Sequence, residues 1–263
     1  MGMEIHLLDR GTISADLNFA LDAEVAAVRS QQSPELRYEE YAVWNMVIDH
    51  PEATVLWDTG SNPDAESVWP APLFEAFAHE DAADHDLETA LAAVGYGVDD
   101  IDIVVQSHLH LDHAGGLYHF DGTDVPVYVH RRELEHAYLS ANTEAGGDAY
   151  LAADFDYDLD WQVVHGDRQL LPGIELLHLP GHSPGLLGAH IHRETDDDVL
   201  IAGDEAFLAP NYEEGREMGT SLVYDSRAWE RSRRKLKERE RRSEATVIYG
   251  HDPDQFERLR DTL

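Results

Sequence analysis

Three histidines and one aspartate lie within six residues in the segment Ser107–Gly116, which begins one residue after the apolar run Ile101–Val105. Imidazole nitrogens and carboxylate oxygens are ligands that zinc prefers in proteins. The first two histidines share a face because alternate side chains of extended backbone point the same way, so they can bind one ion. The glycines at 115 and 116 permit a sharp turn by which the aspartate and the third histidine reach a second ion. The four candidate ligands are His108, His110, Asp112 and His113.

Three further donors stand just after an apolar run, each directly preceded by a glycine. They are His182 after Ile174–Leu179, Asp204 after Val199–Ala202, and His251 after Thr246–Tyr249. A glycine lets the backbone turn or approach an ion closely without a side-chain clash. Four separate strand ends therefore carry seven candidate metal ligands, and this agreement favours a metal site over scattered surface residues. His190 and His192 lack such a context and are interpreted as surface or packing residues.

Composition limits the classes of function. The formal net charge is −34, with two lysines against seventeen arginines. An acidic surface with scarce lysine resembles proteins of salt-accumulating halophiles, in which salt screens the repulsion between like charges. The same charge excludes nucleic acid as an expected partner, because binding to phosphates needs cationic surface. The chain has no cysteine, so thiol catalysis and disulfides are excluded and a metal must be held by histidine and carboxylate.

Periodicity predicts alternating strands and helices in two β-rich halves, and we expect a single domain over residues 1–263. A hairpin is expected from 41–49 and 53–57, and residues 21–28 fit either a short helix or part of a meander. Residues 62–86 fit a lid or a helix-containing connection, and 140–160 fit an excursion over the site. The other expected strands are 4–9, 101–105, 126–130, 161–165, 174–179, 187–192, 199–202 and 245–249, and the other expected helices are 87–96, 131–139 and 226–242.

No membrane partner is expected. The sequence has no apolar run long enough to span a bilayer, and the segment Met1–His6 lacks the basic start and apolar core of a secretory signal, which favours the cytoplasm. The helix predicted over Ser226–Arg242 carries nine of the nineteen basic residues, a cluster that could bind a membrane or an acidic partner. Its i,i+4 Glu–Arg pairs and its narrow buried stripe of Trp229, Arg233 and Leu236 favour a solvated outer helix instead.

The order and context of the seven donors resemble the metallo-β-lactamase superfamily, from Asp58-Thr59-Gly60 through His251. The resemblance implies an α/β fold, the αββα sandwich of two packed mixed sheets with helices on the outer faces. It also implies two divalent metal ions, with zinc expected. One ion would be held by His108, His110 and His182, the second by Asp112, His113 and His251, and Asp204 would bridge them. Within the superfamily, the motifs at 107–116, 180–185 and 249–252 are most similar to those of N-acyl homoserine lactonases.

The implied reaction is hydrolysis of a small-molecule ester, the lactone ring of an N-acyl homoserine lactone. A hydroxide between the two ions would be the nucleophile, since zinc lowers the pKa of bound water to about 7. By the same resemblance Asp112 would pass a proton to the leaving ring oxygen, and Asp58 would orient a ligand histidine. The apolar residues of the 62–86 segment would shape the acyl pocket: Trp69, Leu73, Phe74 and Phe77.

One position departs from the family pattern. Many homoserine lactonases have a tyrosine three residues after the bridging aspartate, where this chain has Phe207. Either Tyr212 or another hydroxyl replaces it, or the metal alone polarises the carbonyl, or the substrate differs. A thioesterase similar to glyoxalase II is the alternative enzyme, which the short segment after His251 disfavours. A metal-binding module without turnover is the alternative from another class, and a homodimer stays open.

Overall fold

The computed structural model describes residues 3–143, 149–194 and 196–263. Part of the segment expected over 140–160, and the first two residues of the chain, lie outside this description. A seven-stranded sheet has the order β4-β1-β2-β3-β5-β6-β7. Its strands are β1 (Glu4–Asp16), β2 (Tyr38–His50), β3 (Ala53–Trp57), β4 (Phe77–Ala78), β5 (Ile103–Val105), β6 (Pro126–His130) and β7 (Asp160–Val164).

A five-stranded sheet from the second half of the chain packs against the first and has the order β12-β11-β10-β9-β8. Both sheets are mixed: β3, β5, β6 and β7 run parallel, as do β11 and β12, while the other neighbouring strands are antiparallel. The strands of the second sheet are β8 (Arg168–Leu171), β9 (Ile174–His178), β10 (Leu187–Ile191), β11 (Val199–Gly203) and β12 (Thr246–Tyr249).

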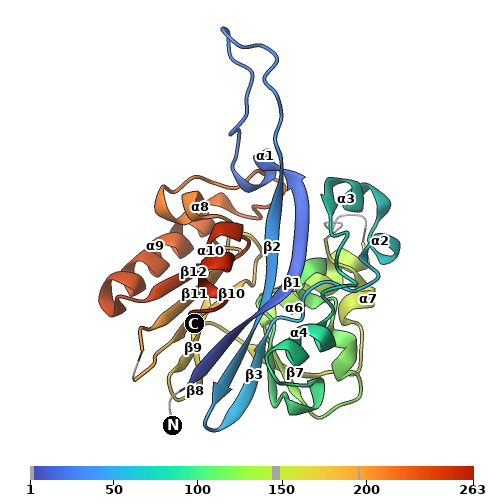
Figure 1. Cartoon of the computed structure of the whole chain (residues 1–263), viewed down its shortest axis with the longest axis vertical. Helices are drawn as coiled ribbons and strands as arrows, with labels where there is room; N and C mark the ends of the chain where they lie inside the picture. The colour runs from blue at the N-terminus through green and yellow to red at the C-terminus, as the bar shows by residue number, and fades with distance from the viewer. Residues whose placement is uncertain (1–2, 144–148, 195) are drawn as a thin grey trace.

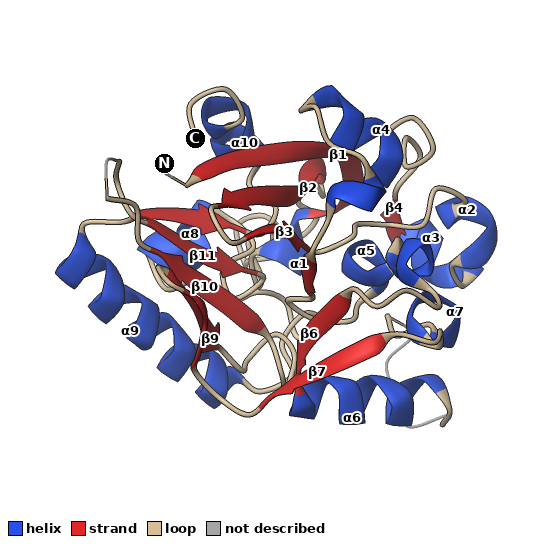
Figure 2. Cartoon of the chain, turned by 90° about the horizontal axis from the view of Figure 1, so that it is seen from below, coloured by secondary structure: helices blue, strands red, loops and turns tan. Residues whose placement is uncertain are grey.

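Helices cover the outer faces of both sheets, as Figure 2 shows for α6 and α9. The longer helices are α4 (Leu87–Ala93), α6 (Arg131–Ala141), α9 (Ser226–Ser243) and α10 (Pro253–Leu259). The short ones are α1 (Leu17–Ala20), α2 (Ala65–Val68), α3 (Ala71–Ala76), α5 (Leu111–Ala114), α7 (Ala152–Phe155) and α8 (Ala209–Glu213), with 3₁₀ turns η1 (Val98–Asp100) and η2 (Leu117–Phe120). The expected αββα sandwich is confirmed.

Apolar side chains on successive strand positions fill different layers. Met46 and Leu176 belong to the core between the two sheets, whereas Leu177 packs on the opposite face, with Leu236 of α9. The outer face of the first sheet is covered in the same way, where Val47 packs with Leu91 of α4. Because both faces of the central strands are buried, their sequences read as continuous apolar runs rather than alternating ones.

Helix α9 lies on the outside of the second sheet, as its sequence predicts. Trp229 and Leu236 are buried, while its cations pair across the surface, for example Arg239 with Glu175 at 2.6 Å and Lys235 with Asp167 at 2.5 Å. The side chain of Asp225 caps the first turn by accepting hydrogen bonds from two backbone N–H groups. Within the described ranges no helix is long and apolar enough to cross a membrane.

The first third of the chain differs most from expectation. Strand β1 continues to Asp16 because it pairs with β2 along nearly its whole length, with a register shift between Asp9 and Thr12. The predicted helix or meander at 21–28 is wrong: residues 21–37 form a projecting loop, the tall blue loop at the top of Figure 1. The 62–86 segment is the helix-containing connection, with α2, α3 and the edge strand β4. Strand β8, α8 and α10 were not predicted.

Candidate metal centre

All seven predicted ligands lie together at one edge of the sandwich. Strands β3, β5, β9, β11 and β12 end there, and each donor stands in the loop or the short helix that follows one of these strands. The first four donors come from the loop after β5 and the short helix α5, on the seven-stranded sheet. The other three follow β9, β11 and β12, so the site draws on both sheets. Three overlapping groups of donors form there: His108, His110 and His182; His108, His113 and Asp204; and Asp112, His113 and His251.

Three imidazole nitrogens of the first group face one another. The Nδ1 atom of His110 lies 3.0 Å from Nε2 of His108 and 2.9 Å from Nε2 of His182, and the two Nε2 atoms are 3.2 Å apart. Burial, with the neighbouring imidazoles, lowers the pKa of His108 and of His110 well below the usual value, so these rings are neutral. Neutral rings that turn nitrogen lone pairs toward one point form a cation site.

Asp204 lies between the first group and the remaining ligands. Its carboxylate oxygens lie 3.4 Å from Nε2 of His182, 3.3 Å from Nε2 of His251 and 3.6 Å from Nε2 of His113. Asp112 closes the second group, with Oδ2 lying 3.6 Å from Nε2 of His113 and 3.7 Å from Nε2 of His251. A carboxylate in the position of Asp204 is placed to share two ions, one with each group.

Hydrogen bonds on the far ring nitrogens fix which nitrogen each histidine presents. The Nδ1–H group of His182 donates to the carbonyl of Leu222 at 2.8 Å, and that of His251 donates to the carbonyl of Ala42 at 2.9 Å. His108 is held in the same way by the hydroxyl of Ser107, 3.0 Å from its Nδ1. Each of these rings therefore directs a bare Nε2 into the centre, the tautomer that binds a metal.

The buried charges fit two cations. Burial alone would lower the pKa of His113, yet Asp112, Asp204 and Asp58 raise it well above the usual value. Burial alone would raise the pKa of Asp204, yet His251 and His113 hold it well below its usual range. Among the described residues, Nε2 of His113 and Oδ1 of Asp204 are buried without a hydrogen-bond partner. Bare donor atoms beside buried carboxylates match divalent ions.

Asp58, which follows β3, forms hydrogen bonds to the residues that carry or neighbour the candidate ligands, as its position in the sequence predicts. Its carboxylate accepts hydrogen bonds from the backbone N–H of Ser107 at 2.6 Å, from the hydroxyl of Ser107 at 2.7 Å, and from Nδ1 of His113 at 3.0 Å. Asp58 has φ of 57°, a left-handed conformation that is uncommon for a residue other than glycine. The sharp turn after β3 thus orients both His113 and, through Ser107, His108.

Two of the glycines that precede the donors have a steric role. Gly203 has φ of 53°, and this turn directs Asp204 into the centre. A Cβ atom on Gly250 would lie 2.6 Å from Oδ1 of Asp204 and 3.0 Å from the carbonyl carbon of Gly203. The strand ends that carry Asp204 and His251 can therefore approach each other only because position 250 has no side chain.

A cavity of about 450 Å³ opens onto the candidate metal centre. His110, Asp112, His182 and Asp204 form its polar end. The rest of its wall is mainly apolar. It comes from β1, the 62–86 segment, α5 and the loops after α6, after β11 and before α9. The apolar residues are Ile13, Leu73, Phe77, Leu111, Ala149, Phe207, Leu222 and Val223. A cavity with one polar end and a long apolar wall suits a ligand with a polar head and an apolar chain.

The predicted pocket residues are correct in part. Leu73 and Phe77 line the cavity, but Trp69 and Phe74 do not. They pack behind it, in a cluster with Ile13 and other apolar side chains, with their rings 6.1 Å apart in an edge-on contact. The sequence pattern identified the apolar side chains of this segment. It did not show which of them line the cavity and which pack behind it.

Phe207 lines the cavity and stacks on a metal-site histidine. Its ring centroid lies 4.2 Å from that of His251, and its edge contacts Tyr41. The suggestion that Tyr212 supplies the missing hydroxyl is wrong, because Tyr212 is buried under α9 and its hydroxyl donates to Glu240 at 3.1 Å. The hydroxyl groups on the cavity wall belong instead to Tyr150, Ser221 and Tyr224.

Glu133 connects several segments of the site through hydrogen bonds, and the sequence analysis did not identify it. It stands on α6, fully buried, and its Oε1 accepts from the backbone N–H of Leu109 at 3.1 Å and from the hydroxyl of Tyr150 at 2.9 Å. Its Oε2 accepts from the hydroxyl of Ser183 at 2.7 Å and from the backbone N–H of Gly185 at 3.1 Å. Burial raises its pKa despite these four donors. One carboxyl group thus joins the 108–113 loop to the 182 loop.

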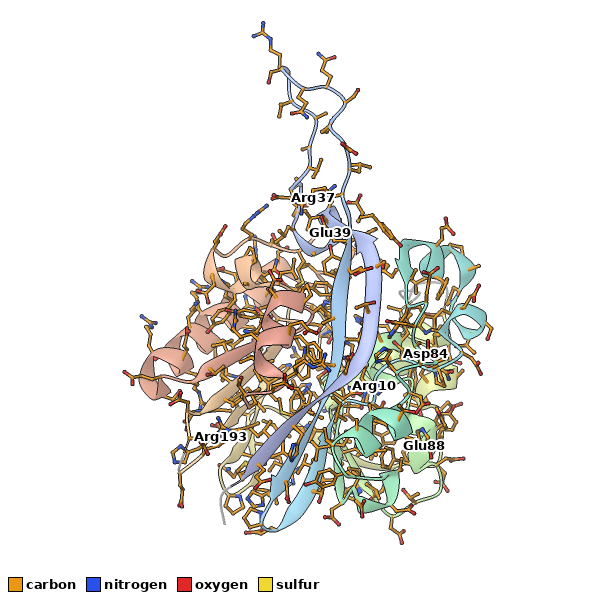
Figure 3. The ribbon with its side chains drawn as sticks, in the orientation of Figure 1. Arg10, Arg37, Glu39, Asp84, Glu88 and Arg193 are labelled. Carbon is orange, nitrogen blue, oxygen red and sulfur yellow. The ribbon has the colours of Figure 1, made fainter. Side chains whose placement is uncertain are left out.

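Arg10 is a second residue that no motif indicated. Its guanidinium is buried beneath the turn after β3, where it donates to the carbonyl of Thr59 at 2.6 Å, to the side-chain oxygen of Asn45 and to the carbonyl of His85 at 2.7 Å. Burial lowers its pKa to about 10, so the group stays charged at neutral pH. The side chain, labelled in Figure 3, fixes the turn that carries Asp58.

Four of the histidines without a proposed ligand role have other partners. His190 and His192 both pair with Asp198, at 2.9 Å and 2.8 Å. His130 and His178 stack with ring centroids 3.7 Å apart and so connect the ends of β6 and β9. These contacts agree with packing and surface roles.

A four-layer sandwich with this donor set at the ends of its strands defines a class of protein: the chain belongs to the metallo-β-lactamase superfamily, whose model matches residues 38–251. Among its relatives is the N-acyl homoserine lactonase AiiB of Agrobacterium fabrum, 30% identical over 271 residues that cover 98% of this chain and 97% of the relative. An N-acyl homoserine lactonase of Bacillus cereus is 30% identical over 217 residues, 81% of this chain and 82% of the relative.

Solved structures agree with this relationship. An N-acyl homoserine lactone hydrolase with the product N-hexanoyl-L-homoserine bound at its catalytic metal centre superposes with a TM-score of 0.81 and 26% identity, over 97% of this chain and 96% of that chain. AidC, a dizinc quorum-quenching lactonase, shares the fold with a TM-score of 0.68 at 17% identity, over 95% of this chain and 88% of that chain.

Proposed function

We propose that this protein is a metal-dependent hydrolase that opens the lactone ring of N-acyl homoserine lactones, and thus a quorum-quenching enzyme. The observation that carries the proposal is the cavity of about 450 Å³, which joins an apolar wall to a polar end made of His110, Asp112, His182 and Asp204. An N-acyl homoserine lactone has the matching shape, an ester ring at one end and an acyl chain at the other. The relatives named as N-acyl homoserine lactonases support this choice of substrate.

We assign two divalent ions, with zinc as the proposed metal. His108, His110 and His182 would hold one, Asp112, His113 and His251 would hold the other, and Asp204 would contribute to both. Bound at neutral pH, such ions polarise an ester carbonyl and lower the pKa of water. The chain supplies the rest of the chemistry through the positions of its own side chains.

Ring opening adds the elements of water across the ester bond. The bond between the carbonyl carbon and the ring oxygen breaks, the carbon gains an oxygen from water, and the ring oxygen needs a proton to leave as an alcohol. Asp112 lies on the cavity wall beside His113 and His251 and is our candidate for carrying that proton. The apolar wall, including Leu73 and Phe207, excludes water from the acyl chain and orients the ring toward the centre.

Phe207 changes how the substrate carbonyl is held. Its ring has no hydrogen-bond donor, so we propose that the side chain at this position does not help to polarise the carbonyl. Phe207→Tyr tests that idea, because a hydroxyl on this ring should lower KM for the lactone if the carbonyl has room to accept. An unchanged KM with unchanged metal content would mean that the carbonyl lies elsewhere.

The test of the function uses the purified, metal-loaded protein in concentrated KCl, since we also propose that its acidic surface is adapted to high salt. Homoserine lactones of several chain lengths and S-lactoylglutathione are supplied as substrates, and acid release is followed in a pH-stat. Lactone hydrolysis with two metal ions per chain is the expected result. Cleavage of the thioester alone would favour a thioesterase, and metal binding without any turnover would favour a binding module.

Asp204→Asn tests the bridging assignment. An amide carries no charge and offers only one oxygen, so metal content and hydrolysis should fall together. A variant that retains both ions and the full rate would contradict the assignment.

A further inference from the structure

A groove of about 380 Å³ lies beside the substrate cavity, between α6 and the first turns of α9 (Figure 2). Three residues line both the cavity and the groove: His136, Pro184 and Tyr224. The two spaces are therefore separated by single side chains and not by a layer of core. None of the seven candidate metal ligands lines the groove, so the proposed reaction at the ester does not use it.

Two aromatic rings, those of His136 and Tyr224, form the partition between the cavity and the groove. They meet edge-on with their centroids 5.1 Å apart, and the His136 ring meets that of Tyr150 in the same way at 5.3 Å. Nε2 of His136 lies 3.3 Å from the hydroxyl oxygen of Ser140, a contact that fixes the orientation of the ring. Burial lowers the pKa of His136, so the ring is neutral at pH 7 and can border an apolar ligand without burying a charge.

The Tyr224 side of the partition is open to solvent. Tyr224 is 59% exposed, although its backbone N–H group is held by the carbonyl of Gly181 at 2.8 Å. Its side chain therefore adds little to the core, and its removal should open the wall without disturbing the fold.

The groove can take an apolar ligand. Apolar residues form much of its wall: Leu139, Pro180, Pro184 and Ala228. Leu139 is 61% exposed, so an alkyl chain that lay along the groove would cover an apolar side chain that the protein leaves in water.

The charged residues of the groove do not oppose such a ligand. Oε1 of Glu135 already pairs with an arginine of the same helix at 2.7 Å, and the carboxylate of Asp225 caps the first turn of α9. Arg132 and Arg231 are exposed, and an arginine can keep its guanidinium group in water while its methylene groups cover an apolar chain. An alkyl chain in the groove would thus leave no buried charge without a partner.

We propose that His136 and Tyr224 set the longest acyl chain that the protein accepts, by closing the cavity off from the groove. The proposal rests on the proposed function, because it concerns the acyl chain of the same substrate. A chain that reaches the two rings has filled the cavity, and further carbons must turn into solvent. Without either ring, the groove continues the cavity and receives those carbons. The two residues thus determine specificity and take no part in the reaction at the ester.

Binding of the ring-opened products tests the proposal without relying on turnover. The metal-loaded protein is titrated in a calorimeter with N-acyl homoserines whose chains range from butanoyl to tetradecanoyl. Each buried methylene strengthens binding about fourfold, so the Kd of the unmodified protein should fall with chain length and then level off where the chain meets the partition. In Tyr224→Ala, and separately in His136→Ala, the fall should continue over further methylenes.

Leu139→Asp shows where the added carbons lie. Leu139 lines the groove and not the cavity, so this substitution alone should leave the Kd values of the whole series unchanged. Combined with Tyr224→Ala, it puts a carboxylate in the path of the chain and should return the plateau to its original chain length. Leu73→Ala is the matched comparison, because Leu73 lines the cavity and not the groove, and any change that it causes should not respond to Leu139→Asp.

A plateau at the same chain length in the unmodified protein and in both alanine variants would overturn the proposal. A gain in Tyr224→Ala that Leu139→Asp does not remove would overturn it too, since the added carbons would then lie outside the groove. If the unmodified protein binds none of the products and opens none of the lactones, the proposed function fails together with this inference. Product binding with an unshifted plateau refutes the role of the partition alone, so the two failures are distinguishable.

Discussion

Replacing Glu133 by glutamine tests whether one buried carboxyl group joins the two loops that carry the metal-site histidines. Each carboxylate oxygen accepts one backbone N–H, from Leu109 on one side and from Gly185 on the other. Glutamine has one oxygen, so either orientation of the amide turns its NH₂ group toward one of these donors. The hydroxyls of Tyr150 and Ser183 can rotate and accept from the amide, but the backbone N–H cannot.

The size of the effect follows from that count. One buried N–H loses its acceptor, which costs about 1–3 kcal/mol of the free energy of unfolding. The repulsion between the two N–H groups also shifts the 108–113 loop relative to the 182 loop. Loss of support around a metal site typically lowers metal affinity by roughly 10- to 100-fold.

The assay is urea unfolding of the metal-loaded protein, together with competition for its metal by a chelator. Glu135→Gln is the matched control, since Glu135 stands on the same helix, is exposed and forms only a surface ion pair with Arg131. The control should change neither quantity measurably. Unchanged stability and metal affinity in Glu133→Gln would refute the argument that this carboxyl joins the two loops.

Three further predictions concern the centre and the surface. Gly250→Ala should displace Asp204 and lower the metal content, which elemental analysis measures. Gly97→Ala is the control, because a Cβ atom there would meet nothing closer than 3.6 Å and should leave the metal content unchanged. Equal metal content in the two variants would refute the steric role of Gly250. Burial and Asp112 raise the pKa of Asp154 from 3.8 to about 7, so its carboxyl increasingly opposes folding as the pH rises from about 4 to 7. Asp154→Asn should therefore stabilise the fold by up to about 4 kcal/mol above pH 7 and leave it unchanged below pH 4, and a difference that does not vary with pH in urea titrations would contradict this. With a net charge of −34, the free energy of unfolding by urea should rise with KCl, because the screening length falls from about 30 Å at 0.01 M salt to about 3 Å at 1 M; a flat or falling dependence would count against salt adaptation.

The positions of the seven donors could be predicted because each depends on a short stretch of sequence. An apolar strand, a glycine and a donor are adjacent in the chain at Asp204 and His251, so local pattern places them at strand ends. The same reasoning found Asp58, which follows β3 directly and bonds His113. The fold class followed from the order of strands and helices together with the family resemblance.

Residues whose role depends on distant partners could not be predicted. Glu133 looks like an ordinary charged residue near the start of an amphipathic helix, and its partners stand at positions 109, 150, 183 and 185. Arg10 is similar, since its acceptors come from three other segments. Trp69 and Phe74 show the same limit, because composition marks them as apolar while packing decides that they support the cavity instead of lining it.

The seven candidate ligands comprise four donors from one sheet and three from the other, so metal ions bound as proposed would connect the two halves of the sandwich where the strands end. His251 adds to this connection, because its ring bonds both the centre and the carbonyl of Ala42 on the opposite sheet. Removal of the metal by a chelator should therefore weaken the packing between the two sheets at this edge, while the hydrogen bonds between the strands of each sheet remain. Limited proteolysis of the metal-free protein should first cut the loops that carry the candidate ligands. The rate of this cleavage should fall again when zinc is restored.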